Sequence, residues 1–334
     1  MAADEIGAGG EWAGEAGRLS ALAPRDAAQW RMASVTLQAL PDDASLQRYR
    51  ERGAYTDCYA LDVAHSVTQA QYVEAFYTTW VFVGHESEIK EAGGRAVANY
   101  DSVAETAGAE NIVKTALDEF GKVDGVVSNA GILRDGTFHK MTPESWDAVL
   151  KVHLYGGFNV IRAAWPHFRE QSFGRVVVAT STSGLFGNFG QANYGAAKLG
   201  LAGLTKTLHL EGAKYNIRVN TLAPVAGTRM TEDLGMPEAL FNALSPENVA
   251  PMALYLVSED APTNMICGAG AGAYHAAYVT LTPGLALPAD ERTPEGIAAN
   301  WAQIIDRTGE IVPQSGGEQS QVVMAALTKI GGLG

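Results

Sequence analysis

The sequence has few of the features that mark a disulfide-stabilised, metal-binding or membrane-spanning protein. Its two cysteines, Cys58 and Cys267, lie far apart and outside any C-x-x-C pattern, so they predict neither a disulfide framework nor a zinc site. No apolar run approaches the length of about 20 residues that a membrane-spanning helix needs. The start of the chain lacks the basic residues and the apolar core of a secretory signal. These absences predict a soluble, cytoplasmic protein with no metal and no membrane partner.

The chain is also poor in positive charge. Its 24 Lys and Arg stand against 37 Asp and Glu, which gives a formal net charge of -13. This excess of negative charge disfavours nucleic acid and anionic membrane surfaces as partners. With 334 residues, 47% of them hydrophobic, the chain can bury a large core. We therefore expect a globular protein whose partner is a small molecule.

From about residue 80, short apolar runs alternate with longer amphipathic runs. This alternation is typical of parallel strands joined by crossover helices. It predicts an α/β fold: a doubly wound, mostly parallel, Rossmann-like sheet with an atypical N-terminal half and a C-terminal extension. Ligands of such sheets collect at the carboxyl ends of the strands. The predicted strands are 95–101, 123–131, 174–184 and 216–224.

Three helices are indicated by capping signals or by apolar periodicity. Thr142 and Pro143 suit the N-cap and the first position of a helix. From Tyr194 onward, leucines at helical spacing form one stripe, as in a packed helix. Residues 301–305 indicate a further helix near the end of the chain. The leucines of the stripe are Leu201, Leu204 and Leu208.

The N-terminal quarter is harder to interpret. "CYALDVA" (58–64) and "WVFVG" (80–84) can form strands on either side of a helix at 66–80. Together with a short helix at "ESEIKEAGG" (86–94) and the strand at 95–101, they would make a βαβαβ half-sheet. A small separate domain would have the same composition, and both alternatives stay open. The predicted organisation is a flexible tail at 1–30, an atypical segment at 31–85, a core at 86–264 and a C-terminal extension near the active site at 265–334.

The stretch "QANYGAAKLG" places Tyr194 and Lys198 one helical turn apart, so the phenol and the ammonium can approach the same point. A tyrosine that exchanges a proton near pH 7 needs its pKa lowered by roughly 3 units, or about 4 kcal/mol. A cation about 4 Å away supplies roughly this amount at an effective dielectric of about 20. The strand end "VVVATSTSG" offers Ser181 and Ser183 as hydroxyl donors to a substrate oxygen. Taken singly, such a pair arises by chance and such a serine often serves as a cap.

In combination these motifs are specific. "NAG" (129–131), the serine-rich strand end, "YGAAK" and "NTLAP" together resemble the short-chain dehydrogenase/reductase family. Four stretches are similar in sequence to one branch of this family, the (3R)-hydroxyacyl-CoA dehydrogenase part of the peroxisomal type 2 multifunctional enzymes and their bacterial relatives. These stretches are "SNAGILRDGTF", "VHLYGGF", "GNFGQANYGAAKLGL" and "APVAGTRM". The resemblance runs from about residue 86 to the C-terminus.

The resemblance implies a role for each matching residue. Tyr194 would be the general acid/base, Lys198 would lower its pKa and hold the cofactor ribose, and Ser181 would bind the reacting oxygen, with Ser183 only a neighbour. The implied cofactor is NAD or NADP, and the family also implies a homodimer or homotetramer paired through the helices around 143–170 and 195–213. The residues expected at the cofactor are Asp101 and Ser102 near the adenine, Asn129, Ala130 and Gly131 along the ribose, and Pro224, Val225 and Thr228 around the nicotinamide amide.

Two departures from the family pattern leave alternatives open. His153 stands where the wider family usually has Asn, and both structural packing and a direct proton role are possible for it. The glycine loop TGxxxGxG, which approaches the cofactor pyrophosphate in this family, is absent from its expected place. The predicted function is hydride transfer between a nicotinamide cofactor and a secondary alcohol or ketone, such as a 3-hydroxyacyl-CoA or a steroid-like substrate. The alternatives are a non-redox lyase or isomerase, or a cofactor-free binding subunit.

Overall fold

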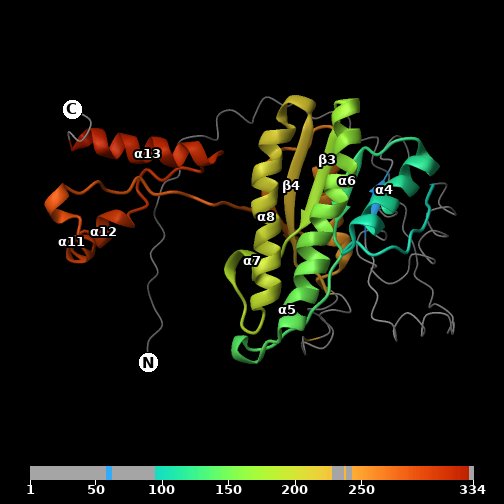
Figure 1. Ribbon diagram of the computed structural model, residues 1–334, viewed down its shortest axis with the longest axis horizontal. Helices are drawn as coiled ribbons and strands as arrows, with labels where there is room; N and C mark the ends of the chain where they lie inside the picture. The colour runs from blue at the N-terminus through green and yellow to red at the C-terminus, as the bar shows by residue number, and fades with distance from the viewer. Residues whose placement is uncertain (1–57, 62–94, 228–236, 238–242, 331–334) are drawn as a thin grey trace. The chain divides into compact units, whose positions relative to one another are not determined.

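The computed structural model describes residues 58–61, 95–227, 237 and 243–330, all of which belong to the compact unit Gly53–Gly334. The described strands form one six-stranded sheet whose spatial order is the order along the chain. Figure 1 shows this sheet with helices packed beside it. The strands are β1 (Cys58–Leu61), β2 (Gly125–Ser128), β3 (Gly174–Ala179), β4 (Ile217–Pro224), β5 (Ile266–Gly270) and β6 (Ala273–Ala277).

The middle of the sheet is parallel and its two outer strands are antiparallel. β2, β3, β4 and β5 pair in parallel, whereas β1 runs antiparallel to β2 and β6 antiparallel to β5. This topology confirms the predicted α/β fold with a mostly parallel, Rossmann-like sheet. The strands predicted at 123–131, 174–184 and 216–224 are β2, β3 and β4, each shorter than its predicted range.

The N-terminal part of the described chain differs from the predicted half-sheet. β1 lies within the strand predicted at 58–64, but it runs antiparallel to its neighbour. The strand predicted at 95–101 is wrong, because these residues have irregular backbone, the Val97 side chain is 38% exposed, and the Asp101 N–H bonds to the Asn99 side chain. The helix predicted at 66–80, the strand at 80–84 and the tail at 1–30 lie outside the described residues.

Helices connect the parallel strands (Figure 1). The predicted helix start is confirmed, because the Thr142 hydroxyl accepts a hydrogen bond from the Ser145 N–H at 3.2 Å and Pro143 is the first helical residue. Short 3-10 segments cover 138–140, 213–215, 246–248 and 289–291. The connections are α4 (Thr106–Phe120) before β2; α5 (Pro143–Leu150), a π-helical turn (Lys151–Tyr155) and α6 (Gly156–Gln171) before β3; α7 (Thr182–Phe186) and α8 (Ala192–Gly212) before β4; and α10 (Ala250–Val257) before β5.

The two faces of the sheet have separate hydrophobic layers, because side chains alternate between faces along a strand. Val176 and Val178 of β3 pack with apolar residues of α4, α6 and α8, whereas Val177 between them packs with those of α10 and β5. The predicted leucine stripe of α8 is confirmed: Leu201 is buried in the first layer, and Leu204 and Leu208 pack against it.

Three helices follow β6: α11 (Pro294–Ala299), α12 (Trp301–Ile304) and α13 (Gly316–Lys329). The helix predicted at 301–305 is α12. An antiparallel bridge joins Leu281 to Ile311, and the Asn264 side chain donates to Gln314 Oε1 at 3.0 Å. No residue of these three helices is buried among the described residues. In the part of the chain that the structure describes, no helix is long and apolar enough to cross a membrane.

Candidate active site

The carboxyl ends of three neighbouring parallel strands meet at one edge of the sheet. The register sets Ser128, the last residue of β2, beside Val178, and sets Ala179, the last residue of β3, beside Leu222 of β4. The segments that follow these strands, 129–131, 180–183 and 225–227, therefore begin at the same edge. This edge is where an open α/β sheet binds its ligands.

Ser181 and Tyr194 lie at the starts of the consecutive helices α7 and α8. Ser181 is the N-cap of α7, and its Oγ accepts a hydrogen bond from the Ser183 N–H at 3.2 Å. Tyr194 lies in the first turn of α8, and the Ser181 side chain acts to lower the pKa of its phenol. The helices α7 and α8 can approach closely because a Cβ at Gly184 would lie only 2.7 Å from the Cβ of Lys198.

Lys198 reaches the same place from one turn further along α8. Its side chain is only 4% exposed, and Nζ donates to the Ala179 carbonyl at 2.6 Å. Nζ also lies 5.5 Å from the centroid of the Tyr194 ring. Thr180 fixes the helix, because its hydroxyl donates to the Lys198 carbonyl at 2.8 Å. Ser181, Tyr194 and Lys198, which the sequence predicted as one constellation, therefore gather at the end of β3.

The electrostatics of this group differ from the prediction. Burial raises the pKa of the Tyr194 phenol, and this effect exceeds the opposing one of the Ser181 hydrogen bond; the Asp135 charge adds a smaller increase. Burial also lowers the pKa of Lys198 from 10.5 to about 7. In the chain without bound cofactor or substrate, the predicted lowering of the Tyr194 pKa by Lys198 is therefore wrong. The physical reason is that desolvation disfavours both charged forms.

His153 forms the wall of the site on the side of "NAG". It is 2% exposed, and its Nε2 lies 3.0 Å from the Ile132 nitrogen and 2.9 Å from the Ile132 oxygen. Nδ1 has no partner among the described residues. Burial, together with the nearby Lys198 charge, holds the pKa of His153 well below its usual value, so the ring is neutral. The ring also meets the Tyr194 ring edge-on at a centroid distance of 5.1 Å.

A buried asparagine that the sequence analysis missed joins the elements around Tyr194. Asn193 is fully buried, and its Nδ2 donates to the carbonyls of Arg134 (2.9 Å) and Ser145 (3.2 Å). Its Oδ1 accepts the Tyr194 N–H at 2.8 Å. Asn193 therefore holds the start of α8 against α5 and against the loop that follows "NAG". Its only signal in the sequence was an amide side chain directly before the tyrosine.

The residues predicted to contact a cofactor occupy different positions along this edge. Ala130 is buried, while Asn129 and Gly131 are half-buried in the turn after β2. Val225 follows Pro224, the last residue of β4, and its N–H donates to the Ala269 carbonyl at 2.8 Å. Thr228 lies outside the described residues. Asp101 and Ser102 precede α4, and the Ser102 hydroxyl accepts the Ala104 N–H at 3.2 Å.

Part of this edge suits a nicotinamide dinucleotide. A lysine ammonium has three donors, and among the described residues only the Ala179 carbonyl accepts a hydrogen bond from Lys198, so donors remain for ribose hydroxyls. The unpartnered Nδ1 of His153 adds a polar atom beside the same turn. These groups fit the nicotinamide and ribose end of the cofactor. The residues that would meet its pyrophosphate are not among those that the structure describes.

Comparison with known proteins defines the class. The family model for short chain dehydrogenases matches residues 83–238. A short-chain type dehydrogenase/reductase of Mycobacterium tuberculosis is 63% identical over 226 residues, which are 67% of this chain and 78% of that protein. This chain therefore belongs to the short-chain dehydrogenase/reductase family. It is an oxidoreductase of a family whose members generally use NAD or NADP.

Within the family, the chain is similar to one part of larger enzymes. It is 47% identical to the mouse peroxisomal multifunctional enzyme type 2 over 73% of this chain but only 33% of that enzyme. It is also 39% identical to the acetoacetyl-CoA reductase of Shinella zoogloeoides, over 52% of this chain and 75% of the reductase. The structure of the full-length Drosophila melanogaster type 2 enzyme matches with a TM-score of 0.66 and 31% identity, over 78% of this chain and 47% of that one.

Proposed function

We propose that this chain catalyses hydride transfer between NAD(P) and the 3-carbon of a 3-hydroxyacyl or 3-oxoacyl thioester. The observation that carries the proposal is the gathering of Ser181, Tyr194 and Lys198 at the carboxyl end of β3, where Lys198 Nζ donates to the Ala179 carbonyl and lies 5.5 Å from the centroid of the Tyr194 ring. The similarity to multifunctional peroxisomal enzymes and to an acetoacetyl-CoA reductase supports the acyl thioester as the substrate class.

A bound nicotinamide ring would supply or accept the hydride, and the residues of the chain handle the proton. In reduction, the Ser181 hydroxyl and the Tyr194 hydroxyl both donate to the substrate carbonyl oxygen, and the Tyr194 proton moves to that oxygen as it becomes an alcohol. Lys198 then faces the phenolate and stabilises it. Because burial raises the pKa of Tyr194, the phenol keeps its proton at neutral pH and can donate it in the reduction.

The test combines binding with turnover. The full chain is titrated with NADH and with NADPH by calorimetry, and acetoacetyl-CoA reduction is followed by the loss of absorbance of the reduced cofactor. Saturable binding of one dinucleotide, and turnover that depends on the thioester, support the proposal. Silence with both dinucleotides overturns it and favours a non-redox or cofactor-free role, which the absence of TGxxxGxG from its expected place would then explain.

We also propose that the chain forms a homodimer through the outer face of α6 and α8. A groove of about 590 Å³ runs along this face, and among the described residues its lining is mostly apolar. Charged residues of both signs, Glu110, Lys114, Arg162 and Glu211, lie at the same groove, so one copy offers complementary charges to another. The apolar lining includes Leu117, Phe158, Ile161, Trp165, Leu204 and Leu208.

A further inference from the structure

Two hydrogen bonds join the loop that follows "NAG" to the segment that precedes α8. The Gly136 N–H donates to the Gly190 carbonyl at 2.8 Å, and Gln191 Nε2 donates to Asp135 Oδ2 at 2.7 Å. We call these four residues the loop clasp. Gly190 has a φ of 80°, a left-handed conformation that glycine adopts without strain. The clasp therefore connects two segments that are distant in the sequence and that flank the candidate active site.

The side chain of Gln191 is held at both ends. Gln191 is the N-cap residue of α8, yet its side chain makes no capping hydrogen bond to that helix. Instead, Nε2 donates to Asp135, and Oε1 accepts from Asn188 Nδ2 at 3.1 Å. With these two partners the amide has one orientation, in which its donor faces the carboxylate. A hydrogen bond to a charged acceptor is stronger than one between neutral groups, so Asp135 is the anchor of this contact.

The anchored residue lies directly before the contacts that hold Tyr194. The Gln191 carbonyl accepts the Gly195 N–H at 2.7 Å in the first turn of α8. Asn193 bonds to the same loop as the clasp does, through the Arg134 carbonyl, and its Oδ1 accepts the Tyr194 N–H. A shift of this loop relative to α8 would therefore move the start of the helix, and the tyrosine with it.

The clasp is better suited to positioning than to stabilising the fold. Asp135 is exposed, and polar contacts of exposed charges contribute little to global stability. A general acid, in contrast, must lie within hydrogen-bond reach of the atom that takes its proton. A misplacement of about 1 Å can cost about 100-fold in rate. Loss of the clasp should therefore change the rate of the reaction more than the stability of the chain.

We propose that Asp135 is a positioning residue for the reaction: by holding Gln191 it keeps the first turn of α8, and with it Tyr194, in place against the substrate oxygen. In this role Asp135 acts through Gln191 and does not need to touch the substrate. The proposal rests on the proposed function, since it needs a thioester that Tyr194 protonates. It gives a role to the aspartate of "SNAGILRDGTF", which the sequence motifs left without one.

The experiment measures kcat and KM for acetoacetyl-CoA reduction at a saturating concentration of the reduced dinucleotide. Asp135→Ala should lower kcat about tenfold, while the KM for the thioester and the affinity for the dinucleotide change less than about twofold. Gln191→Ala should have the same effect. The double variant should be no slower than either single variant, because the two residues act as one unit. Asp135→Asn should restore most of the rate, because an amide oxygen can accept from Gln191 Nε2.

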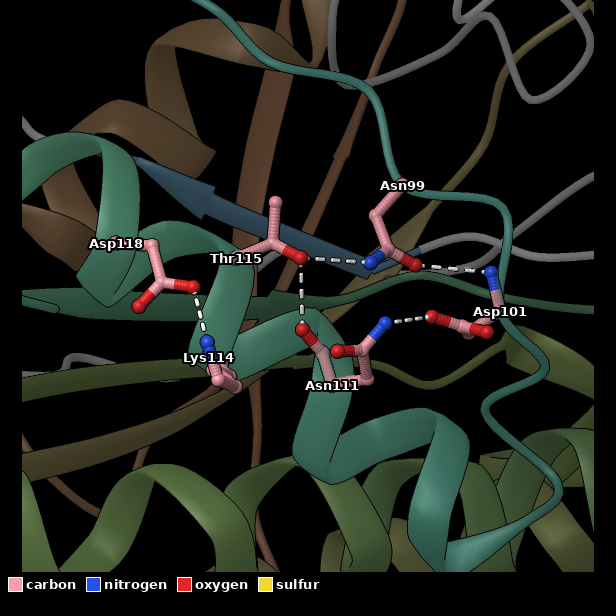
Figure 2. Close-up of polar contacts among 6 residues, drawn as sticks. All are labelled: Asn99, Asp101, Asn111, Lys114, Thr115 and Asp118. Atoms are coloured by element: carbon pink, nitrogen blue, oxygen red, sulfur yellow. Dashed lines mark hydrogen bonds and ion pairs between the residues drawn. The ribbon is translucent and has the colours of Figure 1, made fainter.

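A matched control removes another exposed carboxylate. Asp118 pairs with Lys114 on α4, outside the clasp (Figure 2), so Asp118→Ala should keep the wild-type kcat. A second readout reports position directly. Amide hydrogen exchange of a peptide covering 192–196 should be about three- to tenfold faster in Asp135→Ala than in the wild-type chain, because the first turn of α8 opens more easily. It should be unchanged in Asp118→Ala.

Four outcomes overturn the inference, and they are distinguishable from one another. If folded Asp135→Ala keeps the wild-type kcat, the clasp has no part in the reaction. If kcat falls without faster exchange at 192–196, Asp135 acts on the substrate and not through position. If Asp135→Asn is as slow as Asp135→Ala, or the double variant is slower than both single variants, Asp135 does not act through Gln191. In these three cases the proposed function stands. If the wild-type chain reduces no thioester, the proposed function fails and the inference fails with it.

Discussion

At the scale of single residues, the proton on Tyr194 is central to the proposed chemistry. Tyr194→Phe removes the phenol hydroxyl, while the ring and its contact with His153 can remain. We expect turnover to fall by about 100-fold or more, because a positioned acid contributes at least that much. Dinucleotide affinity and the thermal unfolding midpoint should change little. A variant that keeps near wild-type turnover would remove Tyr194 from the mechanism.

The buried amine of Lys198 predicts how stability depends on pH. Its pKa is about 7 in the folded chain, against an ordinary value of 10.5 for an exposed lysine, so the unfolded chain binds more protons between these values. Stability must then rise with pH across this window, and the penalty for burying the amine is complete below about pH 7. The contribution approaches about 1.4 kcal/mol per pH unit inside the window.

Lys198→Met isolates this contribution, because the other titrating groups are common to both proteins. Denaturant unfolding is measured from pH 7 to pH 9, roughly the lower half of the window. The wild-type chain should gain stability relative to the methionine variant as the pH rises, and the variant should be the more stable of the two at pH 7. Equal slopes for the two proteins would show that the amine is not desolvated in the folded chain.

The sequence predicted which residues form this group but not the direction in which their pKa values shift. Spacing alone predicted that Tyr194 and Lys198 share a face, and the 5.5 Å between Lys198 Nζ and the centroid of the Tyr194 ring agrees with it. The direction of the tyrosine pKa was wrong because it depends on how deeply both groups are buried, which a four-residue spacing does not reveal. Asn193 was missed for a similar reason, since its partners Arg134 and Ser145 lie far from it in the sequence.

At the scale of elements, the π-helical turn and the "NAG" turn fit each other closely. The π-helical turn interrupts the helix that runs from α5 to α6, and His153 in its middle bonds to Ile132. A Cβ at Gly131 would lie 2.5 Å from His153 Cε1, so only glycine leaves room for the ring. π-bulges often occur at functional sites. Here the turn directs a histidine at the loop after β2.

Gly131→Ala should destabilise the chain by about 1–3 kcal/mol, the usual cost of overpacking a close contact. Urea unfolding measures the effect, and Gly136→Ala is the control, since nothing lies within 4 Å of a Cβ there. Adding His153→Ala should relieve the clash, so that the two substitutions together cost less than their sum. Strict additivity would mean that the two residues are not in contact.

The elements that the sequence predicted well are those with local signals. Thr142 and Pro143 start α5, and the alternation in β3 places valines in both hydrophobic layers. The strand predicted at 95–101 failed because small apolar residues alternate there without burial, and side chains such as Asn99 and Thr115 hold the loop instead. The direction of β1 could not be predicted, because strand direction depends on a partner distant in sequence.

At the scale of the whole molecule, the groove along α4, α6 and α8 is the proposed dimer interface. Phe158 is 47% exposed on this face and lines the groove, so Phe158→Glu would place a charge in the proposed dimer interface. Burying an unpaired carboxylate is costly, and the variant should therefore be monomeric at concentrations where the wild-type chain is dimeric. Light scattering after gel filtration measures the mass.

The matched control is Tyr255→Glu, because Tyr255 is 50% exposed on α10, which packs on the other face of the sheet. It should leave the mass unchanged. If Phe158→Glu stays dimeric, the interface lies elsewhere on the chain. If the wild-type chain is itself a monomer, the proposed homodimer is wrong. The candidate active site gathers Ser181, Tyr194 and Lys198 at the end of β3, away from the proposed interface, so we expect a folded monomeric variant still to bind the cofactor.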